Sequence, residues 1–262
     1  MKKIVLFDMD GTLTEPRKKI ESSVVSALTK LTKGGFDIGV VTGSDREYVD
    51  QQLDCMFSIG GPGLDCVDLF PCNGTKHYTA KGRSNYKLTH SVNMINHIGQ
   101  EDYNYLLETL FANQLAISCQ YKIPLTGTFF QYRGSMLNWC PVGRKAGDSE
   151  RSAWVKSDSK FKIRNHYMEQ LNKVIEERNM CVTVALGGST SFDIYPTGWD
   201  KTYVLKHLTL YDQIYFVGDK CKPGGNDHTL YEKLKKINKH DSFETESPEN
   251  TVEIIEELMR KN

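Results

Sequence analysis

The chain opens with a short apolar run that stops at two aspartates. Residues 4–7 are Ile-Val-Leu-Phe, a continuous apolar segment typical of a buried strand in a parallel sheet, and Asp8 and Asp10 follow it. Alternation along an extended chain turns these two carboxylates to the same side. Because ligands of open parallel sheets bind beyond the carboxyl ends of the strands, the pattern predicts a binding site here.

The next segments alternate between helix and strand patterns. Apolar residues recur at helical spacing over residues 21–33, and two glycines follow that can end the helix. Residues 36–41 then predict a second strand, and two strands joined by a helix through short links indicate a parallel α/β sheet. Ser44 follows this strand and forms a capping box with Glu47, so its hydroxyl can simply start the next helix.

The middle of the chain has a different character. Residues 66–70 predict a third strand, which runs into the turn Pro71-Cys-Asn-Gly. Beyond residue 80, helical and alternating patterns mix, and up to about residue 188 no further apolar strand ends at an aspartate. The expected helices there cover residues 101–113 and 162–178, and the expected strands 128–133 and 180–186. We therefore predict a core domain of residues 1–80 and 189–262, interrupted by an α+β insertion of residues 81–188.

Residues 213–218 repeat the opening pattern, an apolar strand followed by Asp219. This strand is expected to lie parallel to the first, with Asp219 close to Asp8, where it can complete the oxygen ligands of a cation. Asp227, in the glycine-rich loop that follows, offers another carboxylate, unless that loop is only solvated. Lys201 precedes a helix; most such lysines are solvated, but beside a nucleophile its charge would balance the carboxylates and steady a phosphoryl group.

The aspartate pair suggests a chemistry. Two carboxylates as close as Asp8 and Asp10 repel each other unless a cation or a proton lies between them, and Mg²⁺ prefers oxygen ligands of this type. One carboxylate can attack phosphorus while the other moves a proton. An isolated Asp-x-Asp-Gly is more often a strand end running into a turn. The full run FDMDGTLT favours the functional interpretation, and it resembles the first motif of the haloacid dehalogenase superfamily of phosphatases and phosphomutases.

Composition narrows the classes of partner. Lysine plus arginine and aspartate plus glutamate both total 33, so the formal net charge is +0 and we expect neither a nucleic-acid nor an anionic-membrane surface. The seven cysteines are scattered without a C-x-x-C pair, which argues against a disulfide framework or zinc site and favours the reducing cytoplasm. No window approaches the ~18 apolar residues of a membrane span, so we expect a soluble protein.

Four segments, FDMDGTLT, VVTGSD, GWDK and GDKCKPGGND, resemble the four motifs of the superfamily in the right order. The insertion between the second and third resembles that of the large-cap subclass. The segments TEPRKKI, GTFFQYRGSMLNWCPVGR, GGSTSFDIYPTGWDK and VGDKCKPGGNDH are more specific and resemble the eukaryotic-type phosphomannomutases. The resemblance implies the α/β class: a Rossmann-like haloacid dehalogenase core with a parallel sheet plus an inserted α+β cap domain.

The resemblance also implies roles for individual residues. Asp8 would be the nucleophile that forms an aspartyl phosphate, Asp10 the general acid and base, and Lys201 the balancing cation. The implied metal ligands are Asp8, Asp10 through its backbone carbonyl, Asp219 and Asp227. Hydroxyls at the end of the second strand would hold the transferring phosphoryl group, arginines the other phosphate, and two cap residues the sugar. The implied substrate-binding residues are Arg17, Thr42, Ser44, Arg133, Arg144, Arg151, Ser191 and Asp193.

The implied activity interconverts mannose 6-phosphate and mannose 1-phosphate, for GDP-mannose biosynthesis, through an aspartyl phosphate and a hexose bisphosphate intermediate. Mg²⁺ would be the cofactor, a hexose 1,6-bisphosphate the activator, and the cap the surface of a homodimer. The alternative enzyme is a Mg²⁺-dependent sugar-phosphate phosphatase with the same aspartate nucleophile. A non-catalytic phosphosugar-binding protein would be expected to lack Asp8, Asp10 or Lys201, and all three are present.

The chain departs from the family at two places. Cys72 stands in a Pro-Cys-Asn-Gly turn where the family usually has Pro-Glu-Asn-Gly. Residues 229–236 lack the acidic residue that the family offers to a second, structural cation. The resemblance therefore leaves open a mutase with altered properties and a relative that only hydrolyses.

Overall fold

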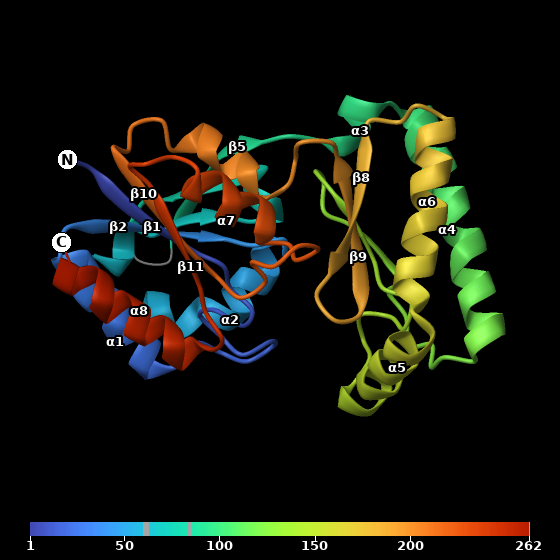
Figure 1. Cartoon of the computed structure of the whole chain (residues 1–262), viewed down its shortest axis with the longest axis horizontal. Coiled ribbons are helices and arrows are strands. Elements are labelled where there is room, and N and C mark those ends of the chain that lie inside the picture. The colour runs from blue at the N-terminus through green and yellow to red at the C-terminus, as the bar shows by residue number, and fades with distance from the viewer. Residues whose placement is uncertain (60–62, 83–84, 262) are drawn as a thin grey trace. The chain divides into compact units, whose positions relative to one another are not determined.

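The computed structural model describes residues 1–59, 63–82 and 85–261, and the chain folds into two compact units (Figure 1). The first unit comprises Met1–Ser91 and Trp199–Asn262, and the second Val92–Gly198. The second is thus an insertion in the first, as the sequence predicted.

The first unit is built on a seven-stranded sheet with the order β11-β10-β1-β2-β3-β4-β5. The strands from β11 to β3 pair in parallel, whereas β4 and β5 are antiparallel. The sheet is therefore mostly parallel rather than wholly parallel. Its strands are β1 (Lys3–Phe7), β2 (Phe36–Val41), β3 (Asp68–Phe70), β4 (Lys76–Ala80), β5 (Tyr86–Ser91), β10 (Gln213–Gly218) and β11 (Asp241–Glu244).

Alternation along β1 supplies two hydrophobic cores, one on each face of the sheet. Val5 and Phe7 pack with α1, α2 and α8, and Ile4 and Leu6 pack with α7 and the 3₁₀ segment η3. All four side chains are fully buried, which is why this strand is a continuous apolar run in the sequence. The helical elements are α1 (Ser22–Lys33), α2 (Arg46–Ile59), α7 (His228–Lys235), α8 (Pro248–Lys261), η1 (Leu64–Cys66), η2 (Cys72–Gly74) and η3 (Lys201–His207).

The second unit has a four-stranded antiparallel sheet, β6-β7-β9-β8, with helices packed against it (Figure 1). Trp139 of β7 is fully buried and stacks on Phe192 of β9 at 4.5 Å between ring centroids, so it is a core residue. The elements are α3 (Met94–Ile98), α4 (Gln100–Tyr121), β6 (Phe130–Tyr132), β7 (Leu137–Trp139), α5 (Asp148–Phe161), α6 (Ile163–Glu177), β8 (Val182–Gly187) and β9 (Ser191–Pro196).

The boundaries between the units lie further along the chain than predicted, at residues 91/92 and 198/199 instead of 80/81 and 188/189. Strand β5 pairs with β4 and extends the sheet of the first unit. Strand β9 pairs with β7 and β8 and belongs to the second. The alternating pattern of a hairpin shows that its strands pair, but not which sheet they join, so the sequence misplaced both boundaries.

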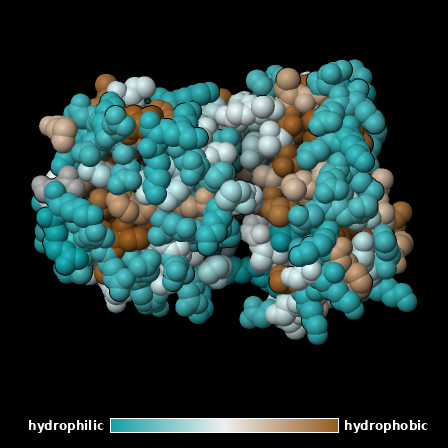
Figure 2. All heavy atoms as spheres, viewed as in Figure 1, coloured by the Kyte–Doolittle hydropathy of each residue, from teal (hydrophilic) through white to brown (hydrophobic). Residues whose placement is uncertain are grey.

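Several elements also differ in length from the prediction. Strand β3 begins at Asp68 rather than at residue 66, because the preceding residues form η1. Helix α4 continues to Tyr121, well past residue 113. Hydrophilic side chains cover most of the surface seen in Figure 2. Within residues 1–59, 63–82 and 85–261, none of the helices combines the length and the apolar character that crossing a membrane requires.

Candidate active site

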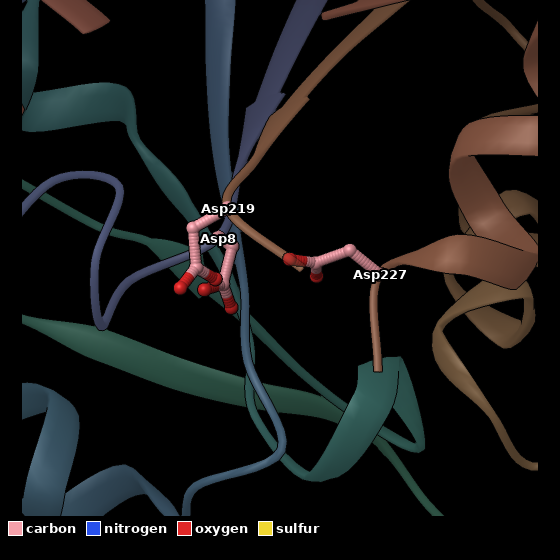
Figure 3. A group of neighbouring side chains, drawn as sticks. All are labelled: Asp8, Asp219 and Asp227. Carbon is pink, nitrogen blue, oxygen red and sulfur yellow. The ribbon is translucent and has the colours of Figure 1, made fainter. Parts of the chain in front are cut away.

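Three carboxylates of the first unit gather at the carboxyl ends of its parallel strands (Figure 3). Asp8 follows β1 and Asp219 follows β10; these strands pair Phe7 with Val217, and the Asp8 N–H donates to the Val217 carbonyl at 2.9 Å. Asp227 comes from the loop before α7. One oxygen from each carboxylate lies within 4.8 Å of the others. The parallel register thus brings together Asp8 and Asp219, and the loop before α7 adds Asp227, a third predicted metal ligand.

Two glycines make room for these carboxylates. A Cβ on Gly11, whose φ is +90°, would lie 2.8 Å from Cγ of Asp219. A Cβ on Gly218 would lie 2.8 Å from Cγ of Asp227. Gly218 has no positive φ, so its backbone conformation does not itself require glycine. Its missing side chain instead allows the close approach of Asp227.

Lys201 is fully buried among these carboxylates. It begins η3, and its Nζ donates to Oδ1 of Asp8 and to Oδ1 of Asp227. The other oxygen of Asp227 accepts the Lys220 N–H at 2.9 Å. Burial lowers the pKa of Lys201, but the carboxylates of Asp227 and Asp8 outweigh burial and raise that pKa above its ordinary value. Lys201 is therefore a permanent cation in the site.

The site carries a surplus of negative charge. Burial raises the pKa of Asp8 to about 7, against the opposing effect of Lys201, and the carboxylates of Asp227 and Asp219 raise it further. Burial likewise raises the pKa of Asp219. Oδ1 of Asp219 is buried without a hydrogen-bond partner, while Oδ2 accepts from Lys220 Nζ at 2.7 Å. Oxygen donors, an unsatisfied carboxylate oxygen and surplus charge together fit a hard divalent cation such as Mg²⁺.

The side chain of Asp10 is hydrogen-bonded to α2. Its Oδ1 accepts from Gln52 Nε2 at 3.0 Å and from the Tyr48 hydroxyl at 3.3 Å. The backbone N–H of Arg17 also points to Oδ1, at 3.4 Å, and Arg17 itself is exposed with a positive φ of 66°. The role of the Asp10 backbone carbonyl as a metal ligand stays a prediction.

The second strand places Thr42 and Ser44 at the same edge of the sheet. Oγ1 of Thr42 accepts the Ser44 N–H at 3.1 Å. Helix α2 begins at Arg46, and the Asp45 side chain caps it by accepting the Tyr48 N–H at 3.2 Å. The capping interpretation of Ser44 is therefore wrong, because the cap is the next residue.

The turn that departs from the family packs against this strand end. The Cys72 N–H donates to the Ser44 carbonyl and the Asn73 N–H to the Thr42 carbonyl, both at 2.8 Å. Cys72 is buried, and Asn73 has the left-handed φ of 63° that asparagine tolerates. The turn therefore forms with cysteine in place of glutamate.

In the second unit, several predicted substrate residues meet: Asp193 on β9, Arg133 just after β6, and Arg144 in the loop after β7. Nη1 of Arg133 lies 3.7 Å from Oδ1 of Asp193. Asn138 links this pair to the next arginine, because it donates to Oδ1 of Asp193 at 2.7 Å and accepts from Arg144 Nη1 at 3.0 Å. Two guanidinium groups and a carboxylate thus form one polar network.

The turn between β8 and β9 is held by two further arginines. Arg151 on α5 donates to the hydroxyls of Ser189 and Thr190 at 3.2 and 3.3 Å. Arg164 on α6 donates to the Gly188 carbonyl at 3.0 Å and pairs with Asp158 at 2.7 Å. Ser191 opens β9 and donates to the Gly187 carbonyl at 2.7 Å.

The motifs in the sequence did not point to several residues of these networks, among them Gln52, Asn138, Arg164 and Lys220. A signal for Gln52 was available. It lies three residues after Val49 and four before Met56, on the buried face of α2, whereas Gln51 is exposed. A polar residue within an apolar helical stripe indicates a buried partner.

The sheet order, the aspartate-tipped strands and the inserted α+β unit define a phosphotransferase fold of the haloacid dehalogenase superfamily. An N-terminally truncated Plasmodium falciparum IMP-nucleotidase is similar over 100% of this chain and 71% of its own, with a TM-score of 0.68 at 13% identity. The C-terminal domain of C. albicans trehalose-6-phosphate phosphatase is similar over 100% and 93%, with a TM-score of 0.59 at 14% identity. At these identities the likeness shows the fold alone.

The chain belongs to the eukaryotic phosphomannomutase family. The model of that family matches residues 24–261. A phosphomannomutase of Saccharomyces cerevisiae is 35% identical over 257 residues, which cover 97% of this chain and 93% of that protein. Phosphomannomutase 1 of Mus musculus is 35% identical over 262 residues, and a phosphomannomutase of Drosophila melanogaster is 32% identical over 261. These matches cover 97% and 98% of this chain and 91% and 95% of the two relatives.

Proposed function

We propose that this chain is a phosphomannomutase, which interconverts mannose 6-phosphate and mannose 1-phosphate. The observation that carries the proposal is the buried Lys201, which bridges Asp8 and Asp227 beside Asp219 at the strand ends. This arrangement supports phosphoryl transfer to a carboxylate, and membership of the family supports the mannose phosphates as substrates.

In the proposed cycle, Asp8 attacks one phosphorus of a hexose bisphosphate and leaves a hexose monophosphate. An Oδ–P bond forms as the bond between phosphorus and the sugar oxygen breaks, and Asp10 gives that oxygen its proton. In the return step Asp10 takes the proton of the other sugar hydroxyl, which attacks the aspartyl phosphate. Lys201 stays charged throughout and offsets the negative charge that accumulates on the transferring group.

Asp8, Asp219 and Asp227 would hold Mg²⁺, with the Asp10 carbonyl as a further oxygen ligand. When bound, the ion supplies Lewis-acid stabilisation of the phosphoryl oxygens. Lys201 orients the nucleophile, because its hydrogen bond fixes Oδ1 of Asp8 and leaves the other carboxylate oxygen for attack. Thr42 and Ser44, at the end of β2, would donate hydroxyl hydrogen bonds to the phosphoryl group.

The second unit would bind the phosphate that is not reacting. Guanidinium groups grip phosphate bidentately, and Arg133 and Arg144 already share a network with Asp193. Arg151 on α5 and Ser191 on β9 would complete this set within the same unit, and a role for Arg17 stays a prediction. A hexose 1,6-bisphosphate fits as both intermediate and activator, because it phosphorylates Asp8 and carries a second phosphate for the arginines.

We also propose a cytoplasmic homodimer that forms through the second unit and supplies mannose 1-phosphate for GDP-mannose biosynthesis. Phe111 and Leu115 on α4 are 56% and 65% exposed one helical turn apart. Phe111 packs on Phe130 of β6, an edge strand of the sheet. A second copy would cover these apolar side chains. None of the seven cysteines, all of which lie within the described residues, forms a disulfide, which suits a reducing compartment.

A direct assay tests the proposal. The protein is incubated with mannose 1-phosphate, Mg²⁺ and a trace of mannose 1,6-bisphosphate, and mannose 6-phosphate is measured by enzymatic coupling. Wild type should form it, and Asp8→Asn should not, because an amide is a poor nucleophile and a weak metal ligand. Full activity of folded Asp8→Asn would refute the assignment.

A further inference from the structure

Two side chains of α2 hold the same oxygen of Asp10. Gln52 Nε2 donates to Oδ1 at 3.0 Å, and the Tyr48 hydroxyl donates to the same atom at 3.3 Å. Tyr48 and Gln52 are four residues apart and therefore lie on one face of the helix, one turn apart. The carboxyl group is thus gripped from a rigid element of the fold and not from a loop.

Gln52 is itself held in place. Its side chain is buried, its Oε1 accepts from the Thr14 hydroxyl, and its backbone carbonyl accepts the Ile20 N–H at 2.9 Å. Because an ionised carboxylate only accepts hydrogen bonds, the amide NH₂ group must face Asp10, and Oε1 then faces the Thr14 hydroxyl. A buried amide bonded at both ends has one orientation, and that orientation presents a donor to the carboxylate.

The two carboxyl oxygens of Asp10 differ in their hydrogen bonds. All the hydrogen bonds that Asp10 accepts within the described residues go to Oδ1, including the longer one from the Arg17 N–H. Oδ2 is therefore the oxygen that can give and take a proton. We infer that Gln52 and Tyr48 are positioning residues that orient the Asp10 carboxyl for proton exchange with the sugar hydroxyl, an inference that rests on the proposed function.

Gln52 could instead have a purely structural role. Two phosphoryl donors with different leaving groups distinguish that role from the positioning of Asp10. A sugar hydroxyl is a poor leaving group that needs the proton of Asp10, whereas acetate leaves acetyl phosphate without protonation. Loss of the Asp10 orientation should therefore slow isomerisation of mannose phosphates but not phosphorylation of Asp8 by acetyl phosphate. A general disturbance of the site should slow both reactions.

The test uses two substitutions, each with a matched control. Gln52→Met keeps the length of the side chain and removes the amide, and Gln51→Met makes the same change at the exposed neighbour. Tyr48→Phe removes one hydroxyl, and Tyr211→Phe removes a hydroxyl that donates to Asp37 at 2.8 Å, in the same unit. Isomerisation of mannose 1-phosphate and the mass gain of the protein with acetyl phosphate are measured for all four variants and wild type.

We expect Gln52→Met to lower kcat for isomerisation by about 10- to 100-fold, and Tyr48→Phe by a smaller factor because its bond is longer. KM and the rate of phosphorylation by acetyl phosphate should stay within about twofold of wild type, as should every rate of the controls. Isomerisation at the wild-type rate in both variants would overturn the inference, and so would a parallel loss of both reactions. Should Gln52→Met not fold, Tyr48→Phe is judged by the same criteria. A wild-type protein that fails to isomerise the sugar would instead contradict the proposed function.

Discussion

Lys201 donates a hydrogen bond to Asp8 although 193 positions separate them in the chain. Neither side chain is more than 5% exposed, so the pair lies in a medium of low dielectric constant where an uncompensated charge is costly. The ammonium also contacts Asp227, and it is therefore the one cation that the folded chain buries between two carboxylates of the site within the described residues. The same buried ion pair is therefore expected to affect both the stability of the fold and the reactivity of Asp8.

Lys201→Met should destabilise the fold, because it leaves two buried carboxylates without their cation. We expect the free energy of unfolding in urea, without Mg²⁺, to fall by about 3–5 kcal/mol. Lys220→Met is the control: its side chain is 40% exposed and pairs with Asp219, so its loss should cost less than about 1 kcal/mol. Equal losses in the two variants would show that burial of Lys201 does not matter.

Asp219 and Asp10 should differ in metal binding. Asp219 points an unsatisfied oxygen into the carboxylate cluster, whereas the Asp10 side chain bonds to α2. Titration calorimetry with Mg²⁺ should therefore show strong weakening for Asp219→Asn and near wild-type affinity for Asp10→Asn, although both lose isomerisation. Equal weakening would contradict the division of roles.

Arg144→Ala should change the balance between transfer and hydrolysis. It removes charge-assisted hydrogen bonds to the second phosphate, each worth about 1.5–3 kcal/mol, so transfer should fall at least tenfold. Slow release of phosphate needs only the carboxylates and Mg²⁺ and should persist. The ratio of inorganic phosphate to mannose 6-phosphate must then rise. Arg178→Ala is the control, because Arg178 pairs with Asp102 and Glu101 on the surface of the same unit. An unchanged ratio in Arg144→Ala would contradict its assignment.

The environment of His207 makes stability depend on pH. Its ring stacks on Phe70, lies near His77 and His90, and carries its Nε2 proton toward the Gly74 carbonyl at 2.8 Å. Burial lowers the pKa of His207 to about 4; the Gly74 carbonyl opposes this, and the charges of His77, His90 and exposed Lys206 add to the lowering.

The pKa of His207 is lower in the folded than in the unfolded chain. Below pH 6.5, the ordinary pKa of histidine, the unfolded chain therefore binds more protons than the folded chain. The contribution of His207 to stability is complete above that value and declines as the pH falls toward 4. The loss is a fraction of the ~1.4 kcal/mol per pH unit that one whole proton gives, since the ring is only half buried. Urea unfolding of wild type and His207→Gln should show a stability difference that shrinks on acidification. A difference that grows would contradict this assignment.

The sequence predicted the parts of the site that depend on local pattern. Asp8 and Asp219 each follow an apolar run, and parallel strands bring their ends together without any further information. Lys201 has no such pattern, because a buried lysine and a solvated one look alike in sequence. Its role was predicted only through the resemblance to a family.

The rest depends on partners that are far apart in the chain, which a local pattern does not identify. Gln52 lies 42 positions from Asp10, and Asn138 lies 55 from Asp193. For Ser44 a local pattern was present but misleading. Its spacing to Glu47 satisfies the capping rule, but Asp45 is the residue that caps α2. Strand β5 was assigned to the insertion because its pairing with β4, which keeps it in the first unit, is a tertiary contact.

The most direct test of the central claim follows both products in one sample. Wild-type protein with mannose 1-phosphate, Mg²⁺ and a trace of mannose 1,6-bisphosphate is monitored by ³¹P NMR. Phosphomannomutase activity predicts that the mannose 6-phosphate signal grows to a constant ratio with mannose 1-phosphate while inorganic phosphate stays a minor product. Growth of inorganic phosphate alone, with no mannose 6-phosphate even when bisphosphate is supplied, would contradict the claim and show a phosphatase.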